Sequence, residues 1–342
     1  MSEAPTDTLS SRPRVLSGMR PTGALHLGHY HGALKNWVKL QATHDCFFFV
    51  ADWHALTTHY QDRGTIERNV YDMVVDWLAA GIDPEQATLF IQSRMPEHAE
   101  LFTLLAMSTP TAWLERIPSY KDQLEKNRPN GEGATYGFLG YPLLQAADIL
   151  IYKAACVPVG EDQTAHVEVT REVARRFNRI YSPERAILPE PQELLTATPR
   201  LPGLDGQKMS KSAGNAIAMR DSPEVVDEKV RTMPTDPQRV RRSDPGEPSR
   251  CPVWPLHQLY SDASTQAWAS EGCRKASIGC LDCKKPLIEA IQAEQKPWRE
   301  RAEAFLANPK QVQWIVEVGT ERARAVARKT LREVRTAMGL AY

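Results

Sequence analysis

The chain has 342 residues, of which 42% are apolar and 25% are charged, and its 42 basic side chains are matched by 42 acidic ones. This balance is typical of a globular protein with room for two domains, and it excludes a uniformly basic, DNA-coating protein. No apolar run reaches membrane-spanning length, and the N-terminus lacks the apolar segment of a secretory signal. We therefore expect a cytoplasmic protein that does not bind membranes or DNA, with a short disordered start at residues 1–13.

The first informative segment, HLGH, follows a strand-like run and a turn at residues 15–23 and precedes a helical pattern. A turn at a helix N-terminus presents free backbone N–H groups to a phosphate, and Gly28 permits close approach of a nucleotide. His26 and His29 would add hydrogen-bond donors. By itself the segment also fits a histidine-rich surface turn, because His31 lies nearby.

Two further apolar, β-prone segments, residues 46–52 and 88–93, are each followed by a helical pattern. This alternation is typical of buried parallel strands in a doubly wound α/β sheet, in which ligands bind beyond the carboxyl ends of the strands. Helical patterns dominate from Pro223 onward. We therefore predict a Rossmann-like α/β catalytic domain at residues 14–216 and a smaller α-helical domain at residues 217–342.

The segment YPLLQAADIL has the character of a buried helix. Its polar residues Tyr141, Gln145 and Asp148 are separated by four and three residues, so they share one side of the helix. The residues around Asp148 are apolar, which argues against an aspartate on a helix surface. A carboxylate at that position without a partner would be costly.

The segment KMSKS lies between turn-forming residues, which predicts an exposed, mobile loop whose Lys208 and Lys211 can close over a ligand. Adenylation of a carboxylic acid needs no protein base, because the carboxylate is already ionised at neutral pH. It needs positive charge around the reacting phosphate and the leaving pyrophosphate. Two lysines three residues apart are commonly only part of a solvated loop. The presence of HLGH upstream, at domain-scale separation, favours a shared ATP site.

Local basic clusters are the candidates for RNA contact, because a net charge of zero gives no global field. One cluster is Arg239, Arg241 and Arg242. The other lies in the C-terminal stretch, where apolar residues recur at near-helical spacing, so its charges fit the wet face of an amphipathic helix equally well. The residues of this second cluster are Arg322, Arg324, Arg328, Lys329, Arg332 and Arg335.

Four of the six cysteines cluster in the second half as C-x21-C-x6-C-x2-C; they are Cys251, Cys273, Cys280 and Cys283. Cytoplasmic thiols stay reduced, so this cluster favours a metal over disulfides. Four thiolates suit either tetrahedral zinc or a 4Fe-4S cubane, and the spacing does not separate the two. The other two cysteines lie in strand-like apolar settings and are expected to be buried thiols.

Taken together, these strings resemble those of class I aminoacyl-tRNA synthetases, and within that class the tryptophanyl enzymes. The resemblance covers residues 14–340 and rests on SGMRPTG, HLGH, DWHAL, YPLLQAADIL, VPVGEDQ, KMSKS and LREVRTAMGL, in that order. It implies activation of L-tryptophan with ATP and Mg²⁺ and transfer to tRNA(Trp), with release of AMP and diphosphate. It also implies a symmetric homodimer in which one tRNA spans both subunits.

The resemblance implies catalytic roles at the phosphates for His26, His29, Lys208 and Lys211. It implies further ATP contacts from the turn before HLGH, from VGEDQ and from the KMSKS loop, namely Arg20, Pro21, Thr22, Gly28, Gly160, Glu161, Asp162, Met209, Ser210 and Ser212. The residues implied to hold tryptophan are Gly18, Tyr141, Gln145, Asp148 and Gln163. An indole offers one donor, its N–H, so an acceptor such as Asp148 is needed. A rival amino acid would leave that acceptor unpaired, so no editing domain is required.

A tyrosyl enzyme is the nearest alternative. Gln145 completes the pattern YxxxQxxD, which resembles tyrosyl-tRNA synthetases, whereas many bacterial tryptophanyl enzymes have methionine there. Tyrosyl enzymes, however, carry a tyrosine on the first strand to meet the substrate hydroxyl, and Leu16 stands at that position here. SGMRPTG and VGEDQ also favour tryptophan.

The cysteine pattern resembles a subset of tryptophanyl enzymes with a 4Fe-4S cluster in the anticodon-binding domain, so we prefer this cluster to Zn²⁺ and expect a structural role for it. We then expect Lys284 and Lys285 to contact the anticodon.

Two other classes of protein are weaker hypotheses. A catalytically inert RNA-binding or regulatory paralogue would lack the phosphate-handling residues, and an HxGH nucleotidyltransferase would lack the second domain.

Overall fold

The computed structural model describes residues 12–127, 134–160, 163–195, 201–211 and 213–342. Within these residues a five-stranded parallel sheet has the strand order β3-β2-β1-β4-β5. The strands are β1 (Arg14–Met19), β2 (Asp45–Val50), β3 (Ala87–Ile91), β4 (Cys156–Val159) and β5 (Gln192–Leu195). The predicted α/β class and the strands at 46–52 and 88–93 are confirmed, with ends that differ by one or two residues. The expected disordered start lies largely outside the described residues.

Alternating side chains of β2 divide the core between the two faces of the sheet. Phe48 and its even-numbered neighbours belong to one buried cluster, whereas Phe47 and Phe49 belong to the other. The first face is covered by α2 (Lys35–Leu40) and α4 (Arg63–Ala80), and Trp37 of α2 stacks on Phe48 with ring centroids 4.3 Å apart. The second face is covered by α5 (Pro96–Ala106), α8 (Tyr136–Ile151) and α9 (Thr164–Tyr181). Burial on both faces explains why the central strands are apolar throughout.

Shorter helices and turns lie between the elements already described. They are α1 (Leu27–His29), the π-helical turn η1 (Tyr30–Leu34), α3 (Asp52–His59), the 3-10 turn η2 (Gln92–Arg94), α6 (Thr111–Glu115) and α7 (Pro118–Asn127). The helical pattern that follows HLGH is therefore η1 joined to α2. None of the helices in the described ranges combines the length and the apolar character needed to cross a lipid bilayer.

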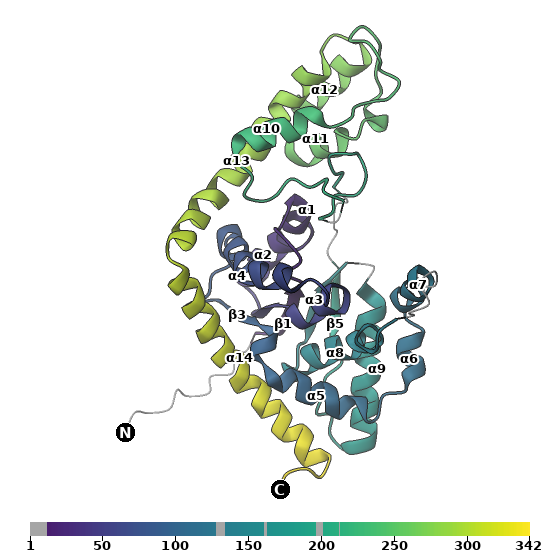
Figure 1. Ribbon diagram of the computed structural model, residues 1–342, viewed down its shortest axis with the longest axis vertical. Coiled ribbons are helices and arrows are strands. Elements are labelled where there is room, and N and C mark those ends of the chain that lie inside the picture. The colour runs from purple at the N-terminus through teal and green to yellow at the C-terminus, as the bar shows by residue number, and fades with distance from the viewer. Residues whose placement is uncertain (1–11, 128–133, 161–162, 196–200, 212) are drawn as a thin grey trace.

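From Pro223 onward the chain is helical, as predicted. It contains α10 (Pro223–Thr232), η5 (Pro248–Arg250), α11 (Trp254–Tyr260), α12 (Ala263–Arg274), α13 (Cys280–Ala307) and α14 (Pro309–Ala337). Helices α10, α11 and α12 gather at one end of the molecule, and α13 leads from them back toward the sheet (Figure 1).

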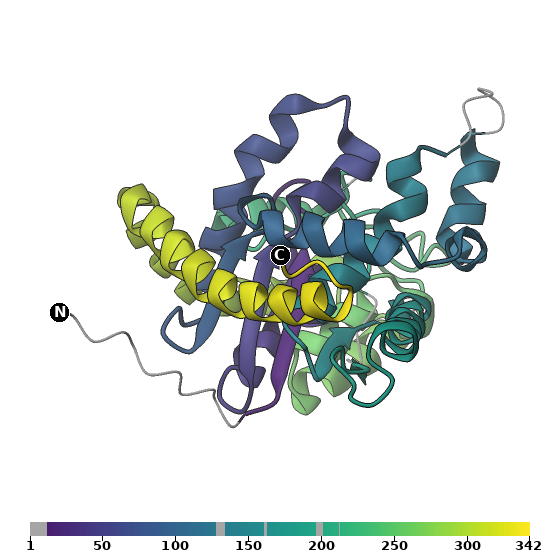
Figure 2. The ribbon, with the colours of Figure 1, turned by 90° about the horizontal axis from the view of Figure 1, so that it is seen from below.

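The last helix departs from the predicted division of the chain at 216. Helix α14 packs on β3 and α5, and a Cβ placed on Gly319 would collide with the backbone oxygen of Leu89 in β3. Seen from below, α14 passes across the sheet-bearing part of the molecule (Figure 2). Its apolar residues, such as Leu331, share a buried cluster with β2 and α8. Residues 309–337 therefore pack with the catalytic unit, because a glycine lets this helix approach the edge strand closely.

Most of the C-terminal basic residues serve the same packing. Arg328 and Arg335 pair with Glu97 and Glu100 of α5, while Arg322 and Arg324 donate to backbone oxygens that flank β3. These contacts favour the amphipathic-helix interpretation of the C-terminal stretch over an RNA-binding patch.

Candidate active site

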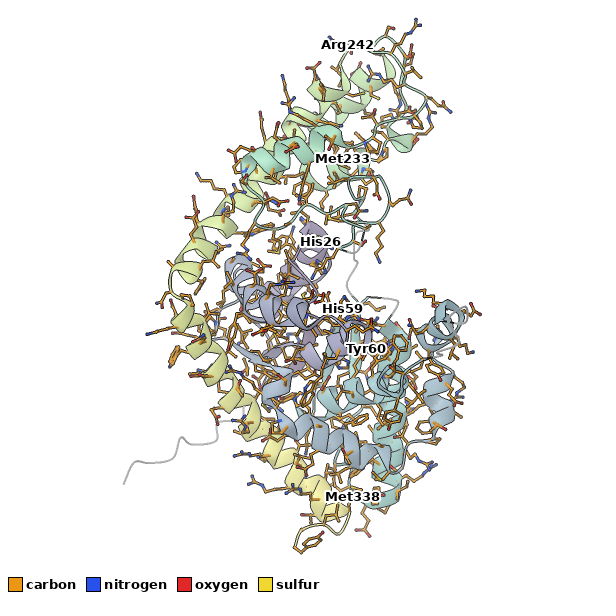
Figure 3. All side chains as sticks on the ribbon, viewed as in Figure 1. His26, His59, Tyr60, Met233, Arg242 and Met338 are labelled. Carbon is orange, nitrogen blue, oxygen red and sulfur yellow. The ribbon has the colours of Figure 1, made fainter. Side chains whose placement is uncertain are left out.

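The two histidines of HLGH lie together in the turn that follows β1. His26 is 7% exposed and precedes the first residue of α1, and the two rings have centroids 3.8 Å apart. The backbone N–H of His26 donates to Nδ1 of His29 over 3.2 Å, so the proton of a neutral His29 is on Nε2. Figure 3 places His26 between the sheet-bearing part and the helical end that carries Arg242.

Both histidines are neutral at physiological pH. Burial, and then the positive charge of Lys211, lower the pKa of His26 to about 4. Burial also holds the pKa of His29 well below its usual value, with further contributions from His26 and Lys211. Nδ1 of His26 is buried and has no hydrogen-bond partner among the described residues, which is costly unless a ligand supplies one. Neutral imidazoles can donate to a phosphate without adding charge.

Gly28 is required by packing. A Cβ at this position would lie 2.9 Å from Cε1 of His26, so any other residue would push that ring aside. We predicted that Gly28 permits close approach of a nucleotide to the backbone. The structure shows a different need for glycine here, which is space for the ring of His26.

The KMSKS segment meets the HLGH turn directly. Nζ of Lys211 donates to the carbonyl oxygen of Gly23 over 2.6 Å. The residues after the loop pair with the turn, since the N–H of Leu27 donates to the oxygen of Ile217 over 3.0 Å and that of Met219 to Leu25 over 2.8 Å. Burial lowers the pKa of Lys211 to about 8. The negative charge of Asp76 raises this pKa, and the positive charge of Arg20 lowers it. The structure therefore brings the two signatures into contact.

The loop itself is more ordered than the prediction of an exposed segment allows. Asn215 accepts from the N–H of Ser210 over 2.8 Å and donates to Asp205 over 2.7 Å and to the carbonyl oxygen of Lys208 over 3.2 Å. Met209 is buried, whereas the side chain of Lys208 is exposed. The prediction of exposure thus holds for Lys208 and is wrong for Met209. The hydrogen bonds of Asn215 to Asp205, Lys208 and Ser210 hold the segment in a compact fold.

Other residues expected at ATP lie around this turn. Arg20, Pro21 and Thr22 form the bend after β1, where the N–H of Thr22 donates to the oxygen of Arg20 over 2.9 Å. Gly160 follows the end of β4. The predicted contacts Glu161, Asp162 and Ser212 lie outside the described residues.

A buried ion pair that we did not predict holds the HLGH turn in place. Asp76 of α4 accepts from Nε of Arg220 over 2.6 Å and from the N–H of Leu25 over 3.3 Å. Arg220 also pairs with Asp72. Burial raises the pKa of Asp76 to about 6, although Arg220 opposes that shift. This pair joins α4, the HLGH turn and the segment that follows KMSKS.

The predicted amino-acid acceptor, Asp148, is completely buried in α8 and already has partners. Its Oδ2 accepts from Nε2 of His54 over 2.7 Å, and its Oδ1 from Nδ1 of His98 over 2.7 Å. Nε2 of Gln92 lies 3.0 Å from both oxygens. Burial alone would raise the pKa of Asp148, but the hydrogen bonds from His54 and His98 outweigh it and lower the pKa. The carboxylate is therefore ionised.

Tyr141 lies on the same side of α8, as its spacing predicted. Its hydroxyl bonds to Nε2 of His166 over 2.7 Å and to the hydroxyl of Ser119 over 2.6 Å. The ring of His54 stands edge-on to Tyr141 with centroids 6.4 Å apart, so His54 links Tyr141 to Asp148. Burial raises the pKa of Tyr141, so its hydroxyl stays protonated.

The remaining residues expected at tryptophan are placed as follows. Gly18 lies near the carboxyl end of β1 beside Phe49 of β2, whose ring fills the space of a Cβ. Gln145 is half-buried in α8, one turn before Asp148. Gln163 is the residue before α9, close to the end of β4. These positions surround the carboxyl ends of the central strands, which is where a parallel sheet binds ligands.

Sequence reasoning missed His54, Gln92 and His98 as site residues. His54 follows β2 and Gln92 follows β3 directly, so both lie at the carboxyl ends of strands that the sequence predicted. That position was a usable signal. His98 lies in α5 and offered no comparable signal.

The four clustered cysteines line one cavity of about 30 Å³ between α12, α13 and the preceding loop, together with Arg239, Asp236 and Lys284. Burial, and then the neighbouring cysteines, raise the pKa of Cys283 to about 12. Within the described ranges, no three or more His, Cys, Asp or Glu side chains are arranged to hold a single metal ion. The cysteines therefore surround a common space without meeting at one point.

Two cations border this cavity. Nζ of Lys284 is buried and donates to the carbonyl oxygens of Arg231 and Met233, over 2.8 and 2.6 Å. Arg239 is also buried and reaches Sγ of Cys273 over 3.9 Å. The expectation that Lys284 faces RNA is therefore wrong, because its ammonium group is held inside by backbone oxygens. Lys285, its neighbour, is exposed.

A parallel α/β sheet with HxGH and KMSKS brought into one site defines a class I aminoacyl-tRNA synthetase. Residues 8–294 match the family model described as class I tRNA synthetases for W and Y. The chain belongs to this family, and it is a ligase that charges tRNA.

Relatives match along nearly the whole chain. The chain is similar to a tryptophan–tRNA ligase of Ralstonia nicotianae, with 55% identity over 96% of this chain and 99% of the relative. A tryptophan–tRNA ligase of Thermotoga maritima is 50% identical over 96% and 100% of the two chains. Among solved structures, a tryptophanyl-tRNA synthetase of Campylobacter jejuni complexed with ADP and tryptophan matches with a TM-score of 0.85, at 33% identity, over 96% and 100% of the two chains.

Proposed function

We propose that the chain activates L-tryptophan with ATP to form tryptophanyl-adenylate and transfers the tryptophan to the 3′ end of tRNA(Trp). The observations that carry the proposal are the contact of Lys211 with the HLGH turn and the buried, ionised carboxylate of Asp148. In the first step an oxygen of the tryptophan carboxylate attacks the α-phosphorus, and the bond to the β-phosphate breaks to release pyrophosphate. In the second, the terminal hydroxyl of the tRNA attacks the adenylate carbonyl and AMP leaves.

The phosphates of ATP would lie against the HLGH turn. Neutral His26 and His29 donate hydrogen bonds, and Lys211 places a positive charge beside them. Exposed Lys208 reaches the leaving pyrophosphate when the loop closes. Mg²⁺ would be held largely by the phosphate oxygens of ATP, as is usual for this ion. Arg20, whose charge acts on both Tyr141 and Lys211, would then lie between the two substrates.

Tryptophan would be held by α8 and the strand ends around it. Asp148 accepts the indole N–H, and the region of Tyr141 and Gln163 holds the ammonium group. A tyrosyl enzyme is disfavoured because Leu16 of β1 is buried and offers no partner to a substrate hydroxyl. The identities with tryptophan–tRNA ligases support the same substrate.

The tRNA would contact the helical end of the molecule. Exposed Lys285 lines an open groove of about 630 Å³ with Trp268, and a single-stranded base can stack on an exposed aromatic ring. We infer a symmetric homodimer that works in the cytoplasm, where tRNA is charged for protein synthesis. The mass in solution, measured by light scattering, tests the dimer.

We also propose that Cys251, Cys273, Cys280 and Cys283 hold a 4Fe-4S cluster. Four sulfurs around one zinc ion lie within roughly 4 Å of one another, because each Zn–S bond is about 2.3 Å long. A cubane spreads its four ligands over four iron atoms, and here four cysteines from separate segments line one cavity. Buried Lys284 and Arg239 offset the negative charge of four thiolates. The cluster would supply a structural link between α12, α13 and the preceding loop.

The test is amino-acid-dependent exchange of pyrophosphate into ATP by anaerobically purified protein. We expect exchange with tryptophan and at most a trace with tyrosine, together with a broad visible absorbance from the cluster. Exchange with tyrosine would overturn the substrate assignment. An absence of exchange by folded protein would favour the inert RNA-binding paralogue.

A further inference from the structure

The carboxylate of Asp148 is held by a buried network that extends beyond the groups expected to touch tryptophan. In the described residues, Oδ1 accepts from His98 and Gln92, and Oδ2 accepts from His54 and Gln92. His98, Gln92 and Asp148 have no exposed surface, whereas His54 is 9% exposed. Oδ1 is therefore bound only by residues with no exposed surface. Oδ2 is bound in addition by His54, the most exposed member of the network.

The second nitrogen of His98 is fixed in turn by Tyr152. Nε2 of His98 lies 2.6 Å from the hydroxyl of Tyr152, one helical turn after Asp148 at the end of α8. Tyr152 is fully buried, and burial, followed by the charge of Asp148, raises its pKa well above the usual value. The hydroxyl therefore keeps its proton and can donate it to Nε2 of His98.

That donation fixes the tautomer of His98. When Nε2 accepts, the ring proton must be on Nδ1, which is the nitrogen that faces Asp148 over 2.7 Å. The rings of Phe49 and Phe90 stand edge-on to His98, with centroids 6.2 and 6.0 Å away, and form apolar walls. Within such walls the donor to Oδ1 comes from the protein, and its loss would leave a buried carboxylate oxygen short of a partner.

We propose that His98, fixed by Tyr152, is a positioning residue for amino-acid recognition. It holds Asp148 so that Oδ2 is the oxygen offered to the indole N–H, and His54 covers that oxygen until tryptophan arrives. This inference rests on the proposed function. Because Oδ2 already accepts from His54 and Gln92, one of these donors must leave when the indole binds, and the more exposed His54 is the one free to move.

Two substitutions at His98 separate its two hydrogen bonds. In His98→Asn the amide nitrogen takes the place of Nδ1, so the bond to Asp148 is kept and the bond to Tyr152 is lost. In His98→Gln the amide takes the place of Nε2, so the bond to Tyr152 is kept and the one to Asp148 is lost. Tyr152→Phe removes only the hydroxyl and leaves the packing in place.

The measurement is pyrophosphate exchange with tryptophan and with β-(3-benzothienyl)alanine, which has sulfur where tryptophan has the indole N–H. Removing a hydrogen bond to a charged group costs roughly 10- to 100-fold. We expect His98→Gln to raise KM for tryptophan by about that factor, to change kcat less than about threefold, and to shrink the preference for tryptophan over the sulfur analogue. His98→Asn should restore most of the affinity, and Tyr152→Phe should raise KM by a smaller factor than His98→Gln.

Several outcomes would overturn the inference. An unchanged KM in both His98→Gln and Tyr152→Phe would show that the network does not position Asp148. If the Asn and Gln variants show the same rise in KM and the same fall in kcat and melting temperature, the role of His98 is purely structural. If His98→Gln does not fold, Tyr152→Phe decides alone. Failure of the proposed function is distinct from these results, because it is seen in the unaltered protein as exchange with tyrosine or as no exchange.

Discussion

Lys211 and Gly23 lie 188 residues apart in the chain, and Nζ of Lys211 donates to the carbonyl oxygen of Gly23 over 2.6 Å. Gly23 is in the left-handed region with φ of 130°, and a Cβ there would lie 3.4 Å from Cδ of the lysine side chain. This contact closes the KMSKS segment on the HLGH turn. It also buries the ammonium group, and the lowered pKa of Lys211 follows from that burial.

The pH dependence of ATP use should report Lys211. Its pKa of about 8 lies below the ordinary value, so the free enzyme loses this positive charge as pH rises through 8. At pH 9 only about a tenth of the protein would keep the charge, and kcat/KM for ATP should fall accordingly. Lys211→Arg should be slower overall but should keep a flat profile to pH 9.5, because arginine stays charged. An equally steep alkaline fall in both proteins would assign it to another group.

The stability of the HLGH turn should depend on pH in the acid range. His26 has a pKa of about 4 when folded and about 6.5 when unfolded, so the unfolded chain binds more protons between these values. The free energy of unfolding should therefore decrease as pH falls from 6.5 to 4, by at most about 3 kcal/mol from this residue. Urea unfolding at pH 7 and at pH 4.5 measures the loss, and His26→Asn should lose less. An identical loss in that variant would contradict the assignment.

Because α14 packs closely on β3, a larger residue in place of Gly319 should lower the stability of the protein. Gly319→Ala should destabilise the protein by roughly 1–3 kcal/mol, because the new methyl group meets the backbone of Leu89. Gly137→Ala in α8 is the matched control: it is exposed, and the nearest atom to its Cβ is the hydroxyl of Thr135 at 3.9 Å. That change should leave stability equal or about 0.5–1 kcal/mol higher. Melting temperatures decide, and equal effects at the two glycines would refute the packing argument.

The metal assignment predicts a cysteine-specific loss. Cys283→Ser should remove most of the iron, sulfide and visible absorbance of anaerobically purified protein and should loosen the helical end. Cys46→Ser is the control, because Cys46 is buried in β2 within the sheet. Stoichiometric zinc without sulfide in the unaltered protein would contradict the cluster and favour a mononuclear site.

Much of this architecture is predictable from the sequence because its signals are local. His26, His29 and Lys211 lie in short strings whose chemistry is evident from a few neighbouring residues, and apolar runs mark the central strands. The partners of Asp148 are different. His54, Gln92 and His98 are 94, 56 and 50 residues away from it, on separate elements. Only the packing of α3, η2 and α5 around α8 brings them together.

The placement of α14 was unpredictable for the same reason. Its amphipathic pattern predicts a helix with a buried face but does not say what covers that face. Gly319 marks the contact only once Leu89 of β3 is known to lie against it. The cysteine spacing likewise predicts a shared site, while the inward turn of Lys284 depends on the carbonyl oxygens of Arg231 and Met233.

The most direct test of the central claim is aminoacylation of an unmodified tRNA(Trp) transcript by the purified protein, with labelled tryptophan and labelled tyrosine in parallel. The account predicts ATP-dependent attachment of tryptophan to tRNA(Trp), no attachment of tyrosine, and a loss of at least about 100-fold in Lys211→Ala, a size typical when a preorganised group that stabilises transition-state charge is removed. Attachment of tyrosine, or full activity in Lys211→Ala, would contradict it.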